Sequence, residues 1–196
     1  PSAPRRPSGP VAAPFAPTIA WKDGKTTFSF EKAQIVLSNR IQVRYTLNDP
    51  EDETKNAKGS FRIRRAKTKF EGWLYVPYLT YEAQFVWTDQ TTGPVEWVYF
   101  NYDVTRGRNL FNVKAGQFKV PYGREQLTSS GSQQFVDRSV VSDEFAKGGD
   151  QGIQFSGGLL GNKLDWRVGM FNGNGRNKND NDNVRYQYDA RVTYQP

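Results

Sequence analysis

VRYQYDARVTY, at residues 184–194, alternates strictly between apolar or aromatic side chains and polar ones. Successive side chains of an extended strand point to opposite faces, so such a stretch gives each face of the strand one kind of side chain. The polar set includes two arginines, Arg185 and Arg191. Residues 184–194 are therefore predicted to form a β-strand with one apolar face and one polar, basic face.

The same alternation recurs along the chain from residue 34 onward, and helical periodicity is nearly absent. Seven further stretches show it: residues 34–48, 60–72, 79–87, 97–104, 111–116, 153–156 and 164–170. We therefore predict an all-β chain with about eight antiparallel strands.

The expected connections between these strands alternate in length. Long ones lie at 48–59, 119–150 and 172–183, a medium one at 89–94, and short ones at 75–77, 105–109 and 161–162. Short turns at one end and long loops at the other are typical of outer-membrane β-barrels. A soluble β-sandwich has no reason to sort its loops by end, so we favour an antiparallel transmembrane β-barrel.

The composition excludes several functional classes. The 196 residues include no cysteine and no histidine, which rules out thiolate nucleophiles, Cys/His zinc sites and histidine-based triads. The net charge of +7 attracts anions. The aromatic residues lie on the strand face opposite the arginines, which argues against nucleic acid as the partner. We expect no enzymatic activity, no catalytic residue, no metal and no cofactor.

The N-terminal part of the chain differs in composition from the rest. Residues 1–20 hold six of the eleven prolines, which block both helix and sheet. We predict a Pro-rich N-terminal tail or linker over residues 1–33, on the periplasmic side of a barrel, and barrel strands over residues 34–196.

If the apolar face meets lipid, the polar face lines the lumen. The alternation places Arg40, Arg44 and Lys114 on that polar face. A basic lumen is expected to be wet and to attract anions; a solvated basic outer face is the alternative. In the stretch FRIRRAK at 61–67 the register is open. Arg62 and Arg64 point inward, or Arg65, Lys67 and Lys69 do, or a β-bulge brings in Arg64 and Arg65 together.

The connection at residues 119–150 is a second candidate feature, because about 30 residues without regular structure are unusual unless they have a function. It contains several hydroxyl side chains and the arginines Arg124 and Arg138. We expect this loop to fold into the pore, narrow it and offer donors to an oxyanion. A mobile external loop is the alternative.

Three motifs in the right order carry a family resemblance. The stretches are VKAGQFKVPYGREQLTSS at 113–130, QFVDRS at 134–139 and GDQGIQF at 149–155. Together they resemble the bacterial phosphate-selective porin O/P family, over about residues 35–196. The resemblance implies sixteen-stranded outer-membrane barrels, typically trimers, in which the third external loop forms the constriction. This chain would supply the N-terminal half.

The resemblance also implies roles for single residues. By motif, Arg64 and Arg65 match the paired arginines of the second strand, and Ser129 and Ser130 match the serine pair of the constriction loop. Arg138 matches the basic residue late in that loop. On the first strand, the resemblance matches Arg40. With Arg44 and Lys114, these residues are our candidates for the anion-binding, pore-lining set.

The function that follows is passive diffusion of small anions, with phosphate as one candidate, or of general hydrophilic solutes, across the outer membrane of a Gram-negative bacterium. We expect membrane lipids and small anions as partners, within a homotrimer or a larger envelope complex. Phosphate-selective members place lysines around the serine pair, whereas the flanking positions here include Gln126 and Gly131, and Glu125 adds negative charge. We therefore expect a general porin or a weak anion preference. The alternative is a porin-like structural or accessory subunit of a cell-envelope assembly.

We also expect the chain to be incomplete. An eight-stranded barrel has an interior that side chains fill. It could not easily take in a loop of about 30 residues. Eight strands would instead make about half of a sixteen-stranded wall.

Overall fold

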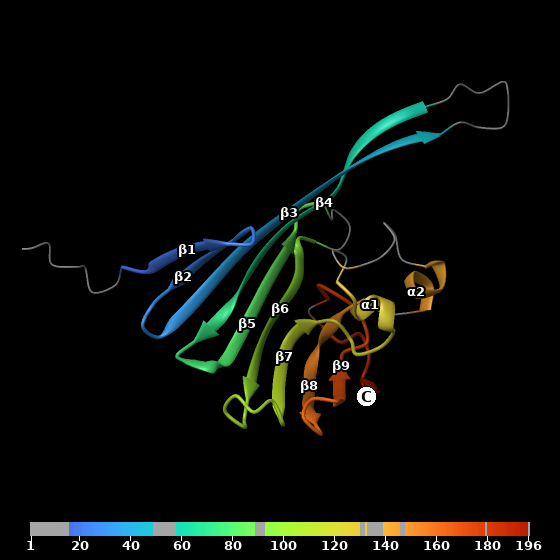
Figure 1. Cartoon of the computed structure of the whole chain (residues 1–196). Coiled ribbons are helices and arrows are strands. Elements are labelled where there is room, and N and C mark those ends of the chain that lie inside the picture. Colours follow the sequence, from blue (N-terminus) through green and yellow to red (C-terminus); the bar gives the residue numbers. More distant parts are fainter. Residues whose placement is uncertain are drawn as a thin grey trace, which may run out of the picture.

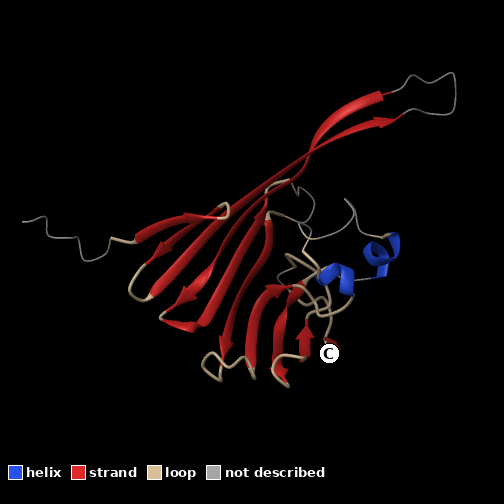
Figure 2. Ribbon diagram, viewed as in Figure 1, coloured by secondary structure: helices blue, strands red, loops and turns tan. Residues whose placement is uncertain are grey.

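The computed structural model describes residues 16–48, 58–88, 93–129, 132, 139–145, 148–178 and 180–195. The strands are β1 (Thr18–Lys22), β2 (Lys25–Ser29), β3 (Ala33–Asn48), β4 (Lys58–Leu74), β5 (Val76–Val86), β6 (Val95–Asp103), β7 (Asn112–Phe118), β8 (Asp150–Leu159), β9 (Leu164–Phe171) and β10 (Gln187–Tyr194). Two short helices, α1 (Arg124–Leu127) and α2 (Val140–Phe145), lie between β7 and β8. Figures 1 and 2 show these elements.

The strands form a single antiparallel sheet in which each strand pairs with the next along the chain, from β1 to β10. The sheet is curved, with the two helices near one end of its strands (Figure 1). Within the described residues β1 and β10 are its two edges, so the barrel is not closed. Strands β3 to β10 correspond to the eight strands predicted from the alternation, and the prediction of an all-β antiparallel fold is confirmed.

Strands β1 and β2 precede the predicted ones and lie within residues 1–33. Asp23 and Gly24 connect them with φ angles of 51° and 73°. A two-residue hairpin turn needs such positive φ angles, and Asp-Gly is among the sequences that adopt them most readily. The proline-rich stretch ahead of this turn led to the prediction of a tail, although Asp23-Gly24 forms a hairpin turn. Residues 1–15, which hold most of those prolines, lie outside the described part of the chain.

The apolar side of the sheet is exposed to the surroundings. Ile41 on β3, Phe100 on β6 and Val192 on β10 are 72%, 52% and 69% exposed. On β10, the polar neighbours Asp189 and Arg191 are half-buried instead. No second layer of described residues covers the apolar face (Figure 2). This is the inverse of a water-soluble sheet and is the pattern of a strand wall that faces hydrocarbon.

A small buried cluster lies on the inner face, where β7 and β9 end. It consists of Phe118, Val120 and Phe171, with Tyr99 packed against it. The rings of Phe118 and Phe171 meet edge to face with centroids 5.4 Å apart. A side chain at position 169 would bring its Cβ to 2.5 Å from the Phe171 ring, so Gly169 makes room for that ring. The cluster fixes the points at which the chain leaves β7 and β9.

Neither helix in the described part of the chain is long and apolar enough to cross a membrane.

Candidate functional site

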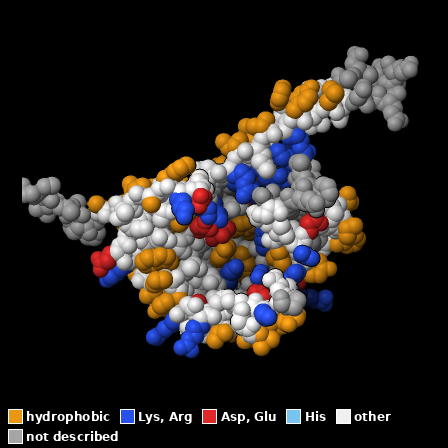
Figure 3. All heavy atoms as spheres, viewed as in Figure 1, with side chains coloured by type: hydrophobic (Ala, Val, Ile, Leu, Met, Phe, Trp, Pro, Cys, Tyr) orange, Lys and Arg blue, Asp and Glu red, His pale blue; other side chains and the backbone are white. Residues whose placement is uncertain are grey.

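The concave face of the sheet encloses a hollow of about 750 Å³ together with the segment that follows β7. Basic side chains are more numerous in its lining than acidic ones. The lining includes Lys25, Arg40, Lys67, Lys69, Lys114, Lys119, Arg167 and Arg176, against Asp23, Glu82 and Glu96. Figure 3 shows basic and acidic side chains around this hollow and hydrophobic side chains along the outer margins. Strand alternation produces this sorting, because the inner residues of each strand are the polar ones.

The open register of residues 61–67 is resolved by a β-bulge. The pairing of β3 with β4 shifts between Gln42 and Val43, so that Gln42 pairs with Arg65 and Val43 with Ile63. Arg64 is the extra residue at this step, and both Arg64 and Arg65 are half-buried. Arg65 donates a hydrogen bond to Gln42 Oε1 at 2.9 Å. The predicted bulge is therefore present at Arg64 and Arg65, and further along β4 Lys67 and Lys69 lie in the lining of the hollow, the direction that the second possibility gave them.

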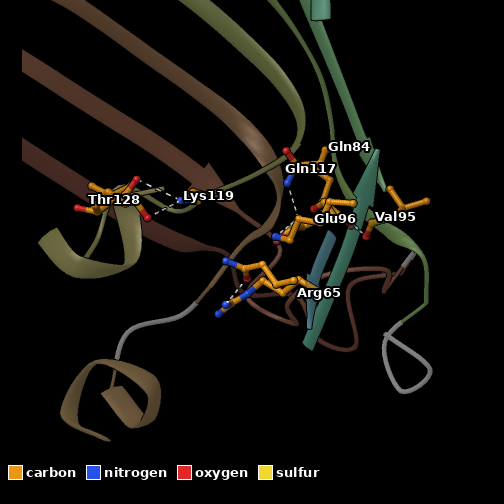
Figure 4. A network of polar contacts seen from close by, with 10 residues as sticks. Arg65, Gln84, Val95, Glu96, Gln117, Lys119 and Thr128 are labelled. Atoms are coloured by element: carbon orange, nitrogen blue, oxygen red, sulfur yellow. Dashed lines mark hydrogen bonds and ion pairs between the residues drawn. The ribbon is translucent and has the colours of Figure 1, made fainter. Parts of the chain in front are cut away.

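A half-buried ion pair links β4 to β6 in the inner wall. Lys67 Nζ lies 2.7 and 2.6 Å from the two carboxylate oxygens of Glu96, and both side chains are 14% exposed. Gln84 on β5 also donates to Glu96 (Figure 4). The carboxylate is thus held from two strands. Its charge offsets that of Lys67.

Lys114 has a different environment. Its ammonium lies over the rings of Tyr99 and Phe118, 4.4 and 5.4 Å from their centroids. Among the described residues no carboxylate forms an ion pair with it, and the nearby Glu82 instead accepts a hydrogen bond from the Tyr99 hydroxyl at 3.0 Å. Cation–π contacts hold an ammonium in place and leave its positive charge uncompensated. Lys114 therefore borders the hollow without an ion-pair partner among the described residues.

A smaller hollow of about 270 Å³ adjoins this lysine. Lys114 and Arg167 line it together with amide and hydroxyl side chains, namely Asn101, Asn109, Asn112, Gln154, Ser156 and Thr80. Arg167 is paired there with Asp165 at 2.8 Å. The wall beneath Lys114 is thus rich in hydrogen-bond donors and contains a single acidic side chain among the residues described.

The segment after β7 is tied to the inner face by Lys119. Its ammonium donates to the backbone carbonyls of Leu127 and Thr128 at 3.1 and 3.3 Å, at the end of α1 (Figure 4). A lysine commonly satisfies the last carbonyls of a helix in this way. As a result Gln126, Leu127 and Ser129 lie in the lining of the hollow.

The two helices are joined by Glu125. Its carboxylate accepts from the Ser139 backbone N–H at 2.8 Å and from the Ser139 hydroxyl at 2.6 Å. The Ser139 hydroxyl also accepts from the N–H of Ser142, as the residue before a helix commonly does. Glu125 is absent from the lining of the hollow. Its negative charge, expected from the sequence to weaken anion preference, is directed at the start of α2.

The candidate residues fall into three groups. Arg40, Lys114 and Ser129 line the hollow. Arg44, Arg64 and Arg65 are not in the lining of the hollow. They lie on the part of the β3–β4 hairpin that extends past β5, because β4 pairs with β5 only from Lys67 onward. Figure 1 shows that extension. Ser130 and Arg138 lie outside the described residues.

Sequence reasoning missed Lys119 and Arg176 as lining residues. Lys119 stands at the end of a strand, where alternation no longer says which way a side chain points. Arg176 stands in an Asn- and Gly-rich connection with no periodicity. Only the hydrogen bonds that fold this connection inward reveal its position, and no local sequence signal predicts them.

Comparison with known families gives one match. The family described as phosphate-selective porin O and P matches residues 35–196, which is most of the chain. Comparisons with curated proteins and with solved structures gave no match. The family match, the antiparallel strands and the exposed apolar face agree with one another: the chain belongs to the phosphate-selective porin O and P family of bacterial outer-membrane porins.

Proposed function

We propose that this porin lets small anions, inorganic phosphate among them, diffuse passively across the outer membrane, with a moderate rather than strict preference for anions. The observation that carries the proposal is the hollow, whose lining holds more basic than acidic side chains and lies opposite an exposed apolar face. Positive charge along a wet passage lowers the energy of an entering anion and raises that of a cation.

Lys114 is the residue to which we assign the largest part in this preference. Its charge is uncompensated by contact with a described carboxylate, and it is reached from both hollows. Lys67 and Lys69 contribute less, because Glu96 and Glu71 lie at 2.6 Å from their ammonium groups. The mixture of paired and uncompensated cations supports a moderate preference.

We assign the narrowing of the passage to residues 119–150. The tie between Lys119 and the end of α1 supports this role, since it keeps Gln126 and Ser129 in the lining. The family resemblance supports assembly as a homotrimer in the outer membrane.

The test is a current measurement on the full-length porin in planar bilayers with a potassium chloride gradient. We expect a reversal potential of the sign that chloride permeation produces, and a decrease in chloride current when inorganic phosphate is added. Lys114→Gln should lower the chloride-to-potassium permeability ratio roughly two- to fourfold, from one unit charge at ~10 Å in water. Arg108→Gln, an identical charge change in an exposed turn, should leave the ratio unchanged.

A protein that inserts but carries no current would contradict the proposal and favour an accessory subunit of the cell envelope. A cation-selective current, or a permeability ratio that Lys114→Gln and Arg108→Gln change equally, would also contradict it.

A further inference from the structure

The connection after β9 turns back over the inner face of the sheet. Its first residues are anchored on β8, where the N–H of Asn172 donates to the carbonyl of Gln151 at 3.0 Å. The N–H of Gly173 donates to Asp150 Oδ2 at 2.7 Å. Asp150 is fully buried, so its carboxylate is a fixed anchor. The start of the connection is therefore held against the wall.

A second anchor lies four residues further on, at Asn177. Its backbone N–H donates to Gln117 Oε1 at 2.7 Å, while Gln117 Nε2 donates back to Asn177 Oδ1 at 3.1 Å. Asn177 Nδ2 also donates to the carbonyl of Val95 at 2.9 Å. Gln117, labelled in Figure 4, is itself buried and hydrogen-bonded to the start of β6. This reciprocal amide contact, the Asn177–Gln117 clasp, fixes the segment across β7 to β6.

Arg176 stands next to the clasp, and the clasp determines where its charge lies. Its guanidinium carbon is 5.8 Å from the centre of the Trp97 ring, and Arg176 is part of the lining of the large hollow. Trp97 is buried, and its ring approaches Gly149 so closely that a Cβ there would lie 2.2 Å from it. The Trp97 ring thus contacts both Gly149, at the end of the 119–150 connection, and the guanidinium of Arg176.

We infer that residues 172–178 are a second segment that narrows the passage, beside residues 119–150, and that Arg176 is a specificity-determining residue for small oxyanions. The inference rests on the proposed anion-conducting function and goes beyond it by naming a segment and a residue. A planar guanidinium can donate two parallel hydrogen bonds to a phosphate or carboxylate, which a chloride ion cannot accept in that way. Arg176 should therefore affect oxyanions more than chloride.

The first test is Arg176→Gln in the full-length porin in planar bilayers. We expect the chloride-to-potassium permeability ratio to fall about twofold, from the loss of one unit charge in a wet passage. The decrease in chloride current caused by inorganic phosphate should weaken as well. Arg176→Lys keeps the charge and loses the planar donor pair, so it should preserve the permeability ratio and weaken only the phosphate effect. Arg108→Gln is the matched control and should behave like the wild type.

The second test measures the position of residue 176 independently of ion conduction. The 196 residues contain no cysteine, so an introduced thiol is the only one among them. The thiol of Arg176→Cys should react with a small maleimide. It should not react with a maleimide that carries a long polyethylene glycol, because the narrow passage excludes the polymer. Arg108→Cys, in an exposed turn, should react with both reagents. Adding Asn177→Ala to Arg176→Cys removes the side-chain hydrogen bonds of Asn177 to Gln117 and to Val95, and puts alanine at a φ of 58°. The backbone N–H of residue 177 can still donate to Gln117, so the clasp is weakened, and the variant should admit the large reagent.

The outcomes distinguish the two proposals. If the wild type conducts anions and responds to Lys114→Gln, but Arg176→Gln equals its control and Arg176→Cys reacts with the large reagent, the role of this segment is overturned and the porin function stands. If the wild type carries no anion current, the proposed function and the selectivity role of Arg176 both fail. Protection of Arg176→Cys would then still support the placement of the segment alone.

Discussion

At the scale of single residues, the charges of the inner wall are organised by pairing. Lys67 and Glu96 form a half-buried ion pair, and Glu71 accepts from both Lys69 and Lys25, at 2.6 and 3.0 Å. A cation held this closely by a carboxylate contributes little field at a distance, because the two charges cancel. The anion preference of the wall is therefore set less by the number of basic residues than by which of them have a carboxylate neighbour.

A substitution of Glu96 tests this view. Glu96→Gln keeps the shape of the side chain and removes its charge, which leaves the charge of Lys67 uncompensated. In water an anion ~10 Å away gains ~0.4 kcal/mol from one unit charge, and a cation loses as much. We expect the chloride-to-potassium permeability ratio to rise roughly two- to fourfold, measured from reversal potentials.

Glu31→Gln is the matched control, because Glu31 is exposed and lies outside the hollow. A permeability ratio that stays constant in Glu96→Gln, with the sheet intact by circular dichroism, would show that the pairing of Lys67 does not limit anion preference.

At the scale of elements, the connection between β7 and β8 owes its arrangement to a few polar contacts between short helices. Helix α1 has four residues and α2 has six, and neither is long enough to be stable alone in water. Lys119 holds the end of α1, and Ser139 joins Glu125 of α1 to the start of α2. Loss of one such contact should therefore loosen the whole connection.

Ser139→Ala removes both the cap of α2 and the hydroxyl that donates to Glu125. The cost should be about 1 kcal/mol, the usual effect of deleting a helix N-cap side chain. We expect faster cleavage within residues 119–150 during limited proteolysis of the porin in lipid vesicles, together with larger fluctuations of the single-channel current. Ser132→Ala, an exposed serine of the same connection, should change neither quantity. Equal cleavage rates in the two variants would contradict a structural role for Ser139.

At the scale of the whole molecule, the sheet has two faces of opposite character. Large apolar side chains are exposed on β3, β4, β6, β8, β9 and β10, and the polar face is curved around the hollow. A lipid environment accounts for this arrangement, since exposed apolar side chains are stable against hydrocarbon and costly in water. The loss of stability on introducing a charged side chain should therefore depend on whether the position lies on the apolar face or on the polar face.

Two neighbouring positions on β6 provide a matched test. Phe100 points outward, whereas Asn101 points inward and donates to Asn112 at 3.4 Å. Phe100→Lys should destabilise the porin by about 2–4 kcal/mol if it faces the middle of the bilayer, and Asn101→Lys by clearly less. Urea unfolding in phosphatidylcholine vesicles measures both values. A larger loss for Asn101→Lys would mean that the faces are assigned the wrong way round.

Much of the fold could be predicted because it depends on a local pattern. Eight of the strands follow from alternation alone, and the same period of two puts Lys114 on the polar face, where it lines the hollow. Strands β1 and β2 were missed, since each has only five residues and their Asp-Gly turn follows a proline-rich stretch. The register at Arg64 and Arg65 stayed open because a bulge depends on how β3 and β4 are aligned, which neither strand encodes by itself.

The sequence by itself determined which face of each strand is apolar, because side-chain direction follows from the backbone and needs no partner. It also determined the family, through motifs that lie within single segments. Only the tertiary structure decided which charges lie close together: the pairing of Lys67 with Glu96 and the inward position of Arg176 join residues far apart in the chain. Such contacts depend on the register between neighbouring strands and on the folding of the connections over the sheet, and the alternation within one strand predicts neither.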